Sequence, residues 1–275
     1  MLASERYWDK WDRISEGMLQ EIGKGFLERL WRGREESPES LLFDTTNYFT
    51  YMATKTRSKL AVRGRNKSGK HHLCQVGLGL LVDRAASLPL YYTVYPGNLH
   101  DSNLFHRVMD EFFGVIAGFS QGQKQLTVIF DKGMNSEENI ALIDGRKEIH
   151  NYHWSTEQIV TASLDRSHIE KQFRVSKAPC HVRVNPIFHW TDSKIRCHLL
   201  TCLIALSALR LLEILVGRRL SAKTIIEEMR NLNLVLTWHK GQKRPQLHIE
   251  HPDPMQAQVL AALGHKIENG SVLHI

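Results

Sequence analysis

The sequence is poor in the patterns that mark secreted, zinc-binding and membrane-spanning proteins. Its four cysteines, in 275 residues, include no CxxC pair, which argues against a structural zinc site or a disulfide framework. Its first residues lack the basic and then apolar order of a secretory leader. The apolar segment 195–216 contains the uncharged run 199–209, far shorter than the roughly 20 residues that cross a bilayer. We therefore expect a cytoplasmic protein with no membrane partner, in which this segment forms a buried core helix.

Acidic residues are in the minority. Lysine and arginine outnumber aspartate and glutamate by 36 to 29, which gives a formal net charge of +7. A basic balance favours a polyanionic partner such as nucleic acid, but charge alone does not identify one. The hydrophobic content of 42% is enough for a sizeable core, so general disorder is not expected.

The spacing of apolar residues predicts an α/β core in residues 37–180, preceded by a helical extension (1–36) and followed by a mainly helical region (181–275). The expected core strands are 41–51, 73–82, 88–95, 126–130 and a weak strand at 147–153. The expected core helices cover about 104–113, a segment capped by Ser136, and 155–175. Three strands, helix, strand, helix, weak strand and helix is the order of the ribonuclease-H-like fold, a mixed sheet flanked by helices.

Three acids have distinctive places in this order. Asp44 lies in the first strand, Asp131 directly follows the fourth long strand, and Glu170 lies on the last helix. Each alone has an ordinary explanation as a cap or turn residue. Together they form the kind of carboxylate cluster that holds Mg²⁺ or Mn²⁺. Two such ions about 4 Å apart activate a nucleophile and stabilise the leaving oxygen in phosphodiester cleavage. We therefore predict that these three acids are both catalytic residues and metal ligands.

Basic residues accompany the acids in two places. Arg166, Arg174 and Lys177 share one face of the predicted helix with Glu170, at spacings of four, four and three. They are predicted to contact DNA phosphates, and the alternative is a solvated ladder of salt bridges. Residues 55–72 carry seven cations and no acid, and are either a DNA-binding segment or a solvated loop made flexible by two glycines, Gly64 and Gly69. The predicted DNA-binding residues of this segment are Arg63, Arg65, Lys67 and Lys70.

These residues resemble the transposases of bacterial insertion sequences in the family numbered four, within the DDE superfamily. That family's signature is a tyrosine, two residues, an arginine, three residues, a glutamate, six residues and a lysine. Arg166, Glu170 and Lys177 match it, and Ser163 stands at the tyrosine position. The resemblance extends over most of the chain, through FDTTNYF, RGRNKSGKHHLCQVGLGLLVDR, YPGNLHDS, VIFDKG, WSTEQIV, IEKQFR and FHWTDSKIRCH.

The resemblance implies an enzyme that cuts at transposon ends and joins them to target DNA. Asp44, Asp131 and Glu170 would be its catalytic triad, holding two Mg²⁺ or Mn²⁺ ions, and Arg166 and Lys177 would contact DNA near the transposon end. Residues 221–275 have weak motifs, and either pack on the core or pair two protomers as a homodimer across DNA ends.

The sequence departs from the family in length. Members usually carry a β-rich insertion between the second aspartate and the glutamate, and a longer N-terminal region. Here 38 residues separate Asp131 from Glu170, and the chain starts about forty residues before Asp44, so it resembles a truncated, internally shortened copy. Two alternative functions follow: a catalytically inactive remnant that still binds DNA, and a ribonuclease-H-like nuclease that performs no strand transfer.

Overall fold

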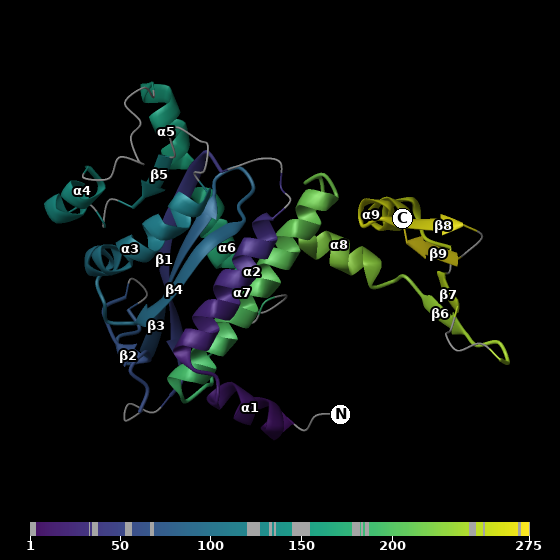
Figure 1. Cartoon of the computed structure of the whole chain (residues 1–275), viewed down its shortest axis with the longest axis horizontal. Coiled ribbons are helices and arrows are strands. Elements are labelled where there is room, and N and C mark those ends of the chain that lie inside the picture. The colour runs from purple at the N-terminus through teal and green to yellow at the C-terminus, as the bar shows by residue number, and fades with distance from the viewer. Residues whose placement is uncertain are drawn as a thin grey trace. The chain divides into compact units, whose positions relative to one another are not determined.

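The chain folds into two compact units, Met1–Ser207 and Ala208–Ile275 (Figure 1). The computed structural model describes residues 4–32, 34, 38–52, 57–66, 69–119, 127–131, 134, 136–144, 155–177, 182, 184, 187–241, 246–249, 251–268 and 271–274. The weak strand predicted at 147–153 and the predicted DNA-binding residue Lys67 lie outside the described residues.

A five-stranded mixed sheet forms the centre of the first unit. Its strands are β1 (Ser40–Thr50), β2 (Val62–Arg63), β3 (Cys74–Asp83), β4 (Pro89–Pro96) and β5 (Thr127–Phe130). β1 pairs antiparallel with β3 and parallel with β5, while β4 and β2 pair with the other edge of β3. β1, β3 and β4 form a long antiparallel meander, and β5, which follows the next helix, pairs parallel with β1. This is the strand order of the ribonuclease-H-like fold. The predicted fold is therefore confirmed.

Aromatic packing fixes one face of this sheet. Phe43 of β1 lies against two rings of α3 (Asp101–Phe119), with ring centroids 5.9 Å from Phe105 and 5.6 Å from Phe112. Phe105 also lies 4.8 Å from Phe130 of β5. Because side chains alternate along a strand, the burial of Phe43 on α3 turns its neighbour Asp44 to the opposite face.

The opposite face is covered by α2 (Glu16–Trp31) and α7 (Asp192–Leu215), which lie beside each other in Figure 1. α2 approaches β4 closely at Gly23, where an added Cβ would lie 2.6 Å from the Tyr92 hydroxyl. The indole of Trp31 donates a hydrogen bond to the Pro89 carbonyl (2.8 Å). Register pairs Leu80 with both Asp44 and Tyr92, so Asp44 shares this face of the sheet.

The N-terminal region is two helices rather than the single helical stretch expected for residues 1–36. α1 (Ser4–Asp12) ends before α2, whose N-cap is Ser15. The start of α7 holds this junction, because Ser193 Oγ donates to the carbonyls of Trp11 (2.5 Å) and Ile14 (2.7 Å). The helices are thus part of the first compact unit. That unit ends inside α7 at Ser207, so its limits differ from the predicted boundaries at 36/37 and 180/181.

By length and composition alone, α7 would pass for a membrane-spanning helix. One such helix is weak evidence, because the core helix of a soluble protein passes the same test. Eight of its residues, between Ile195 and Ser207, are buried within the first unit. The predicted core helix therefore exists, with Cys197 and Cys202 packed as small apolar side chains.

The second unit combines helices with a small antiparallel sheet. Val216, Ile225 and Val259 form its buried cluster, between α8 (Ala222–Met229) and α9 (Pro254–Ala262). Its sheet has the order β6 (Leu234–Thr237), β7 (Gln246–Ile249), β9 (Ser271–His274) and β8 (His265–Glu268). The region expected to be mainly helical therefore also contains these four strands, each only four residues long, which is too short for a clear alternating pattern in the sequence.

Gly97, in the turn after β4, provides a direct test of this packing. An added Cβ there would lie 2.0 Å from the backbone oxygen of Gln75, which cannot move without distorting β3. We expect Gly97→Ala to lower the free energy of unfolding by about 1–3 kcal/mol. Gly114→Ala is the control, since a Cβ on this α3 glycine meets nothing within 4 Å, and alanine should stabilise the helix there by about 0.5–1 kcal/mol. Urea unfolding in which Gly97→Ala is as stable as wild type would contradict the close approach.

Candidate catalytic site

The parallel pairing of β1 with β5 brings two of the predicted acids together. Phe43 is the register partner of Phe130, so the next residues along the two strands, Asp44 and Asp131, lie beside each other. Residues in register on neighbouring strands point to the same face of a sheet. Both carboxylates are therefore carried on the face of the sheet opposite α3.

Asp44 is the more buried of the two, and its environment disfavours its charged form. The pKa of Asp44 is raised to about 6, first by burial and then by the negative charges of Asp131 and Glu170. Two effects oppose this shift: the hydrogen bond that the Thr45 backbone N–H donates to Asp44 Oδ1 (2.8 Å), and the positive charge of Arg166. All three predicted acids thus belong to one electrostatic site.

The helix predicted over 155–175 is in fact two helices, α5 (Thr156–Leu164) and α6 (Ser167–Lys177). The chain turns at Asp165 and Arg166, although the sequence there has no glycine or proline that would predict the end of a helix. A tertiary ion pair holds the turn, because Arg84, just after β3, donates from Nε to Asp165 Oδ2 (2.7 Å). This break could not be predicted from helix propensity, because propensity is a local property and carries no information about long-range ion pairs.

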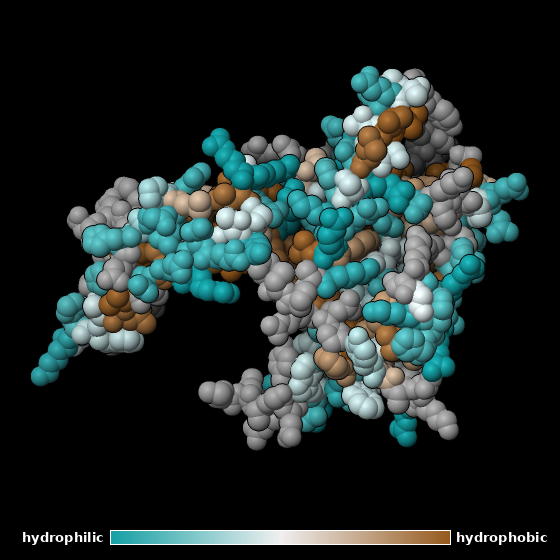
Figure 2. Space-filling model, turned by 180° about the vertical axis from the view of Figure 1, so that it is seen from behind, coloured by the Kyte–Doolittle hydropathy of each residue, from teal (hydrophilic) through white to brown (hydrophobic). Residues whose placement is uncertain are grey.

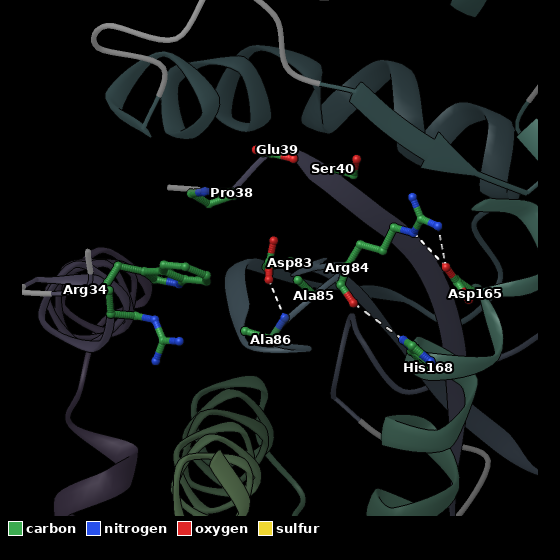
Figure 3. Close-up of a pocket in the computed structure, with 11 residues that line it drawn as sticks. Arg34, Pro38, Glu39, Ser40, Asp83, Arg84, Ala85, Ala86, Asp165 and His168 are labelled. Carbon is green, nitrogen blue, oxygen red and sulfur yellow. Dashed lines mark hydrogen bonds and ion pairs between the residues drawn. The ribbon is translucent and has the colours of Figure 1, made fainter. Parts of the chain in front are cut away.

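Figure 3 shows this junction at the wall of a pocket of about 560 Å³. The Arg84 side chain reaches Asp165, and His168 Nδ1 donates to the Arg84 carbonyl (3.4 Å). None of the three acids lines the pocket. α5 itself buries only Ala162 and carries an exposed apolar surface, seen over α5 at the upper right in Figure 2. The junction is therefore a structural support beside the site.

The break changes the role of Arg166. Instead of extending a helical ladder toward Glu170, its guanidinium donates to Asp131 Oδ2 (3.0 Å). Its Nε is buried and finds no hydrogen-bond partner among the described residues. In the described part of the chain, Glu170 makes no ion pair with Arg166 or Arg174. The solvated ladder is therefore not formed.

Glu170 lies in the first turn of α6 and is exposed. The first turn of a helix carries partial positive charge from its free N–H groups, which favours a carboxylate there. Ile169 and Phe173 on the same helix are buried, and so anchor α6 while Glu170 stays accessible. α6 packs on β1, the strand that carries Asp44.

The C-terminal end of α6 is tied to the middle of β1. Lys177 Nζ donates to Thr46 Oγ1 (2.5 Å) and lies 5.8 Å from the ring centroid of Tyr48. The Tyr48 hydroxyl is 2.6 Å from Ser176 Oγ, and both residues are buried. Burial lowers the pKa of the Lys177 amine, and the charge of Asp44 opposes that shift. Lys177 is thus held against β1, where it feels the charge of Asp44.

The basic segment is anchored by packing at Gly64 and Arg65, where the sequence predicted flexibility. Gln75, fully buried in β3, donates its amide to the carbonyls of Gly97 (2.6 Å) and Arg65 (3.3 Å). A Cβ on Gly64 would lie 2.4 Å from the Gly97 carbonyl, so Gly64 serves close packing and not freedom. The exposed members of this segment that the structure describes include Arg63, Arg65 and Lys70, and Arg174 on α6 is also exposed.

Among the described residues, no group of three His, Cys, Asp or Glu side chains is placed to hold one ion together. The ion pair with Arg166 occupies one oxygen of Asp131.

A family model described as a transposase DDE domain matches residues 49–207, more than half of the chain. The chain belongs to the transposase DDE domain family. The matched part of this DDE domain includes Asp131, Arg166, Glu170 and Lys177, and it begins after Asp44. No curated protein matches the sequence.

Solved structures of the Mos1 mariner transposase show low similarity to this DDE domain. The Mos1 catalytic domain is 10% identical, with a TM-score of 0.27, over 72% of this chain and 94% of that one. The Mos1 chain in a pre-cleavage transpososome is 11% identical, with a TM-score of 0.26, over 72% of this chain and 64% of that one. The chain therefore spans less than two thirds of the length of that Mos1 chain. Strand order, and not these values, identifies the fold.

The raised pKa of Asp44 predicts a pH-dependent cost to the metal-free DDE domain. An acid with a pKa of about 6 when folded and 3.8 when unfolded stabilises the fold relatively more at low pH. That advantage is lost as pH rises from about 4 to about 6. We expect Asp44→Asn to be more stable than wild type at pH 8 in EDTA, and the difference to shrink toward pH 4. Equal differences at both pH values in urea unfolding would contradict the raised pKa.

Proposed function

We propose that this chain is a DNA transposase that uses Asp44, Asp131 and Glu170 for metal-dependent cleavage and strand transfer at the ends of an insertion sequence. The observation that carries the proposal is the β1–β5 register, which brings Asp44 beside Asp131. It is supported by the match of residues 49–207 to a transposase DDE domain. The signature residues Arg166, Glu170 and Lys177 favour the bacterial insertion-sequence family numbered four.

The donor set fits divalent metal. Carboxylate oxygens are the ligands that Mg²⁺ and Mn²⁺ prefer, and a cation beside Asp44 would favour its charged form. Asp44, Asp131 and Glu170 would hold the metal, and we propose two ions. A structure titled with the Mos1 catalytic domain, raltegravir and Mn is among the similar ones. When bound, such ions supply Lewis acidity and an activated oxygen nucleophile for attack on phosphorus.

The residues of the chain divide the remaining work. Arg166 balances the negative charge of the acids in the metal-free protein, because it pairs with Asp131 and lowers the pKa of Asp44. A bound metal ion would compete with Arg166 for the Asp131 carboxylate, and a DNA phosphate would offer the guanidinium a replacement partner. Lys177, fixed by Thr46, provides a positive charge along β1 for the backbone of the same DNA.

The exposed cations favour DNA as the partner. Arg63, Arg65, Lys67, Lys70, Arg166, Arg174 and Lys177 are the proposed phosphate contacts. A pairing of two DNA ends would require a homodimer, and structures titled as Mos1 paired-end complexes are among the similar ones. We propose that the protein acts on transposon ends and target DNA in the cytoplasm.

The first experiment measures nicking and joining of labelled DNA that carries the element's own ends, with Mg²⁺, Mn²⁺ or EDTA. We expect activity only with metal, and a loss of at least about a hundredfold in Glu170→Gln, as for removal of a group essential to the chemistry. Glu138→Gln, an exposed glutamate in the first turn of α4 (Glu137–Asp144), is the matched control. Cleavage without joining would indicate a nuclease. DNA binding without any cleavage would indicate the inactive remnant.

The salt dependence of DNA binding tests the basic segment. Each phosphate contact adds about 0.9 to the slope of log affinity against log salt on duplex DNA. We expect the triple variant Arg63→Ala, Arg65→Ala, Lys70→Ala to reduce that slope by about two to three. Lys24→Ala, an exposed lysine on α2, should leave the slope unchanged. An unaltered slope in the triple variant would mark the segment as a solvated loop.

A further inference from the structure

Exposed aromatic side chains gather where β1 ends. Tyr51 is 61% exposed and Phe188 is 64% exposed, and their rings stack with centroids 6.4 Å apart at an angle of 28°. Trp190, two residues further on, is 67% exposed. Large aromatic side chains in contact with one another are usually buried, so an exposed stacked pair is a candidate binding surface.

The backbone beneath these rings is well anchored. Thr50 and Ile187 form a parallel bridge and are both fully buried. His189 turns inward, with its ring 4.6 Å from Trp8 and 4.9 Å from His198. Burial lowers the pKa of His189 to about 4, so it packs there uncharged. Because Ile187 and His189 point inward, Phe188 and Trp190 are held outward in a fixed arrangement.

Positive charge lies next to this surface along the chain. Asp192, just after Trp190, accepts hydrogen bonds from Ser58 Oγ (2.5 Å) and from the Lys59 backbone N–H (3.1 Å). These bonds tie the start of the basic segment to the segment that carries Phe188. Arg57 and Lys59, on either side of Ser58, are both exposed. The surface therefore combines aromatic rings with cations.

The surface also continues the line of the proposed catalytic site. Along β1 come Asp44, then Thr46 with Lys177, and finally Thr50 beside Ile187. Thr50 lies about 20 Å from Asp44 along the strand, at roughly 3.3 Å per residue. That is the length of about six base pairs of B-form DNA. A DNA strand that extended about six nucleotides from the acids along β1 would have the length to reach the aromatic rings.

We propose that Tyr51 and Phe188, with Trp190 beside them, form a stacking site for unpaired bases of single-stranded DNA. Every base has a flat face that stacks on an aromatic ring, while neighbouring cations hold the backbone, so such a site needs no particular sequence. The inference rests on the proposed action on DNA. Strand cleavage and transfer produce unpaired segments, and this surface would retain them beside the acids.

Stacking is measurable without catalysis, by the fluorescence of 2-aminopurine in a single strand of about 16 nucleotides. We expect the full-length protein to quench the probe, and Tyr51→Leu or Phe188→Leu to bind it about tenfold more weakly, as for one lost base stack. Tyr51→Phe keeps the ring and should behave as wild type. Trp238→Leu removes an exposed aromatic of the second unit and should also bind normally. Unchanged thermal unfolding of the leucine variants will show that they fold.

Binding to a blunt duplex of the same sequence separates stacking from backbone contact. The leucine variants should bind the duplex as wild type does. Equal losses on duplex and single strand, or no loss on either, would overturn the proposal. So would normal single-strand binding together with an altered oligomeric state in sedimentation, which would make the surface a protein contact. A protein that stacks bases but does not cleave would refute the proposed catalysis alone, while the converse result would refute only this site.

Discussion

The burial of Asp44 beside a second carboxylate is the constraint on which the site in the first unit depends. The β1–β5 register fixes Asp44 beside Asp131, and neither strand can shift without moving Phe43 and Phe130 off α3. Two contacts limit the cost of this arrangement: Arg166 pairs with Asp131, and the Thr45 N–H binds Asp44. The remaining cost, which comes first from burial and then from the neighbouring negative charges, appears as the raised pKa of Asp44. A divalent cation would relieve that cost more completely than a single guanidinium, since it carries twice the charge.

The support for this arrangement lies outside the acids themselves. Arg84 leaves the end of β3 and holds Asp165, so the turn between α5 and α6 is fixed to the sheet. The turn sends Arg166 to Asp131 and starts α6 so that Glu170 occupies its first turn. At the other end, Tyr48 and Thr46 hold Ser176 and Lys177. The helix is thus attached to the sheet at both ends, and the glutamate between these attachments has little freedom along the strand.

Local sequence patterns were sufficient to predict the strands that position Asp44 and Asp131. β1 and β3 to β5 are long or strongly apolar, and the acids that interrupt or follow them were visible against that background. The break at Asp165 was not predictable, because its cause is an ion pair with a residue 81 positions away. The rigidity of the basic segment was missed for the same reason. Gly64 suggests flexibility in a sequence, and only the packing against Gly97 and Gln75 shows that it allows close approach. The roles of the three acids in metal binding and catalysis remain predictions.

The anchoring and the exposure of the basic segment bear on its proposed binding to DNA. A flexible lysine-rich loop would lose conformational freedom on binding, and that loss would offset part of its attraction to phosphate. Here Gln75 fixes the path at Arg65, and Asp192 fixes it at Lys59, so much of that ordering occurs when the chain folds. The same anchoring keeps Phe188 in water, where an apolar ring is unfavourable. Aromatic rings held in water at one end of β1 make the free protein less stable than burial of the same rings would. Contact with a nucleic acid would cover these rings and offset that loss of stability.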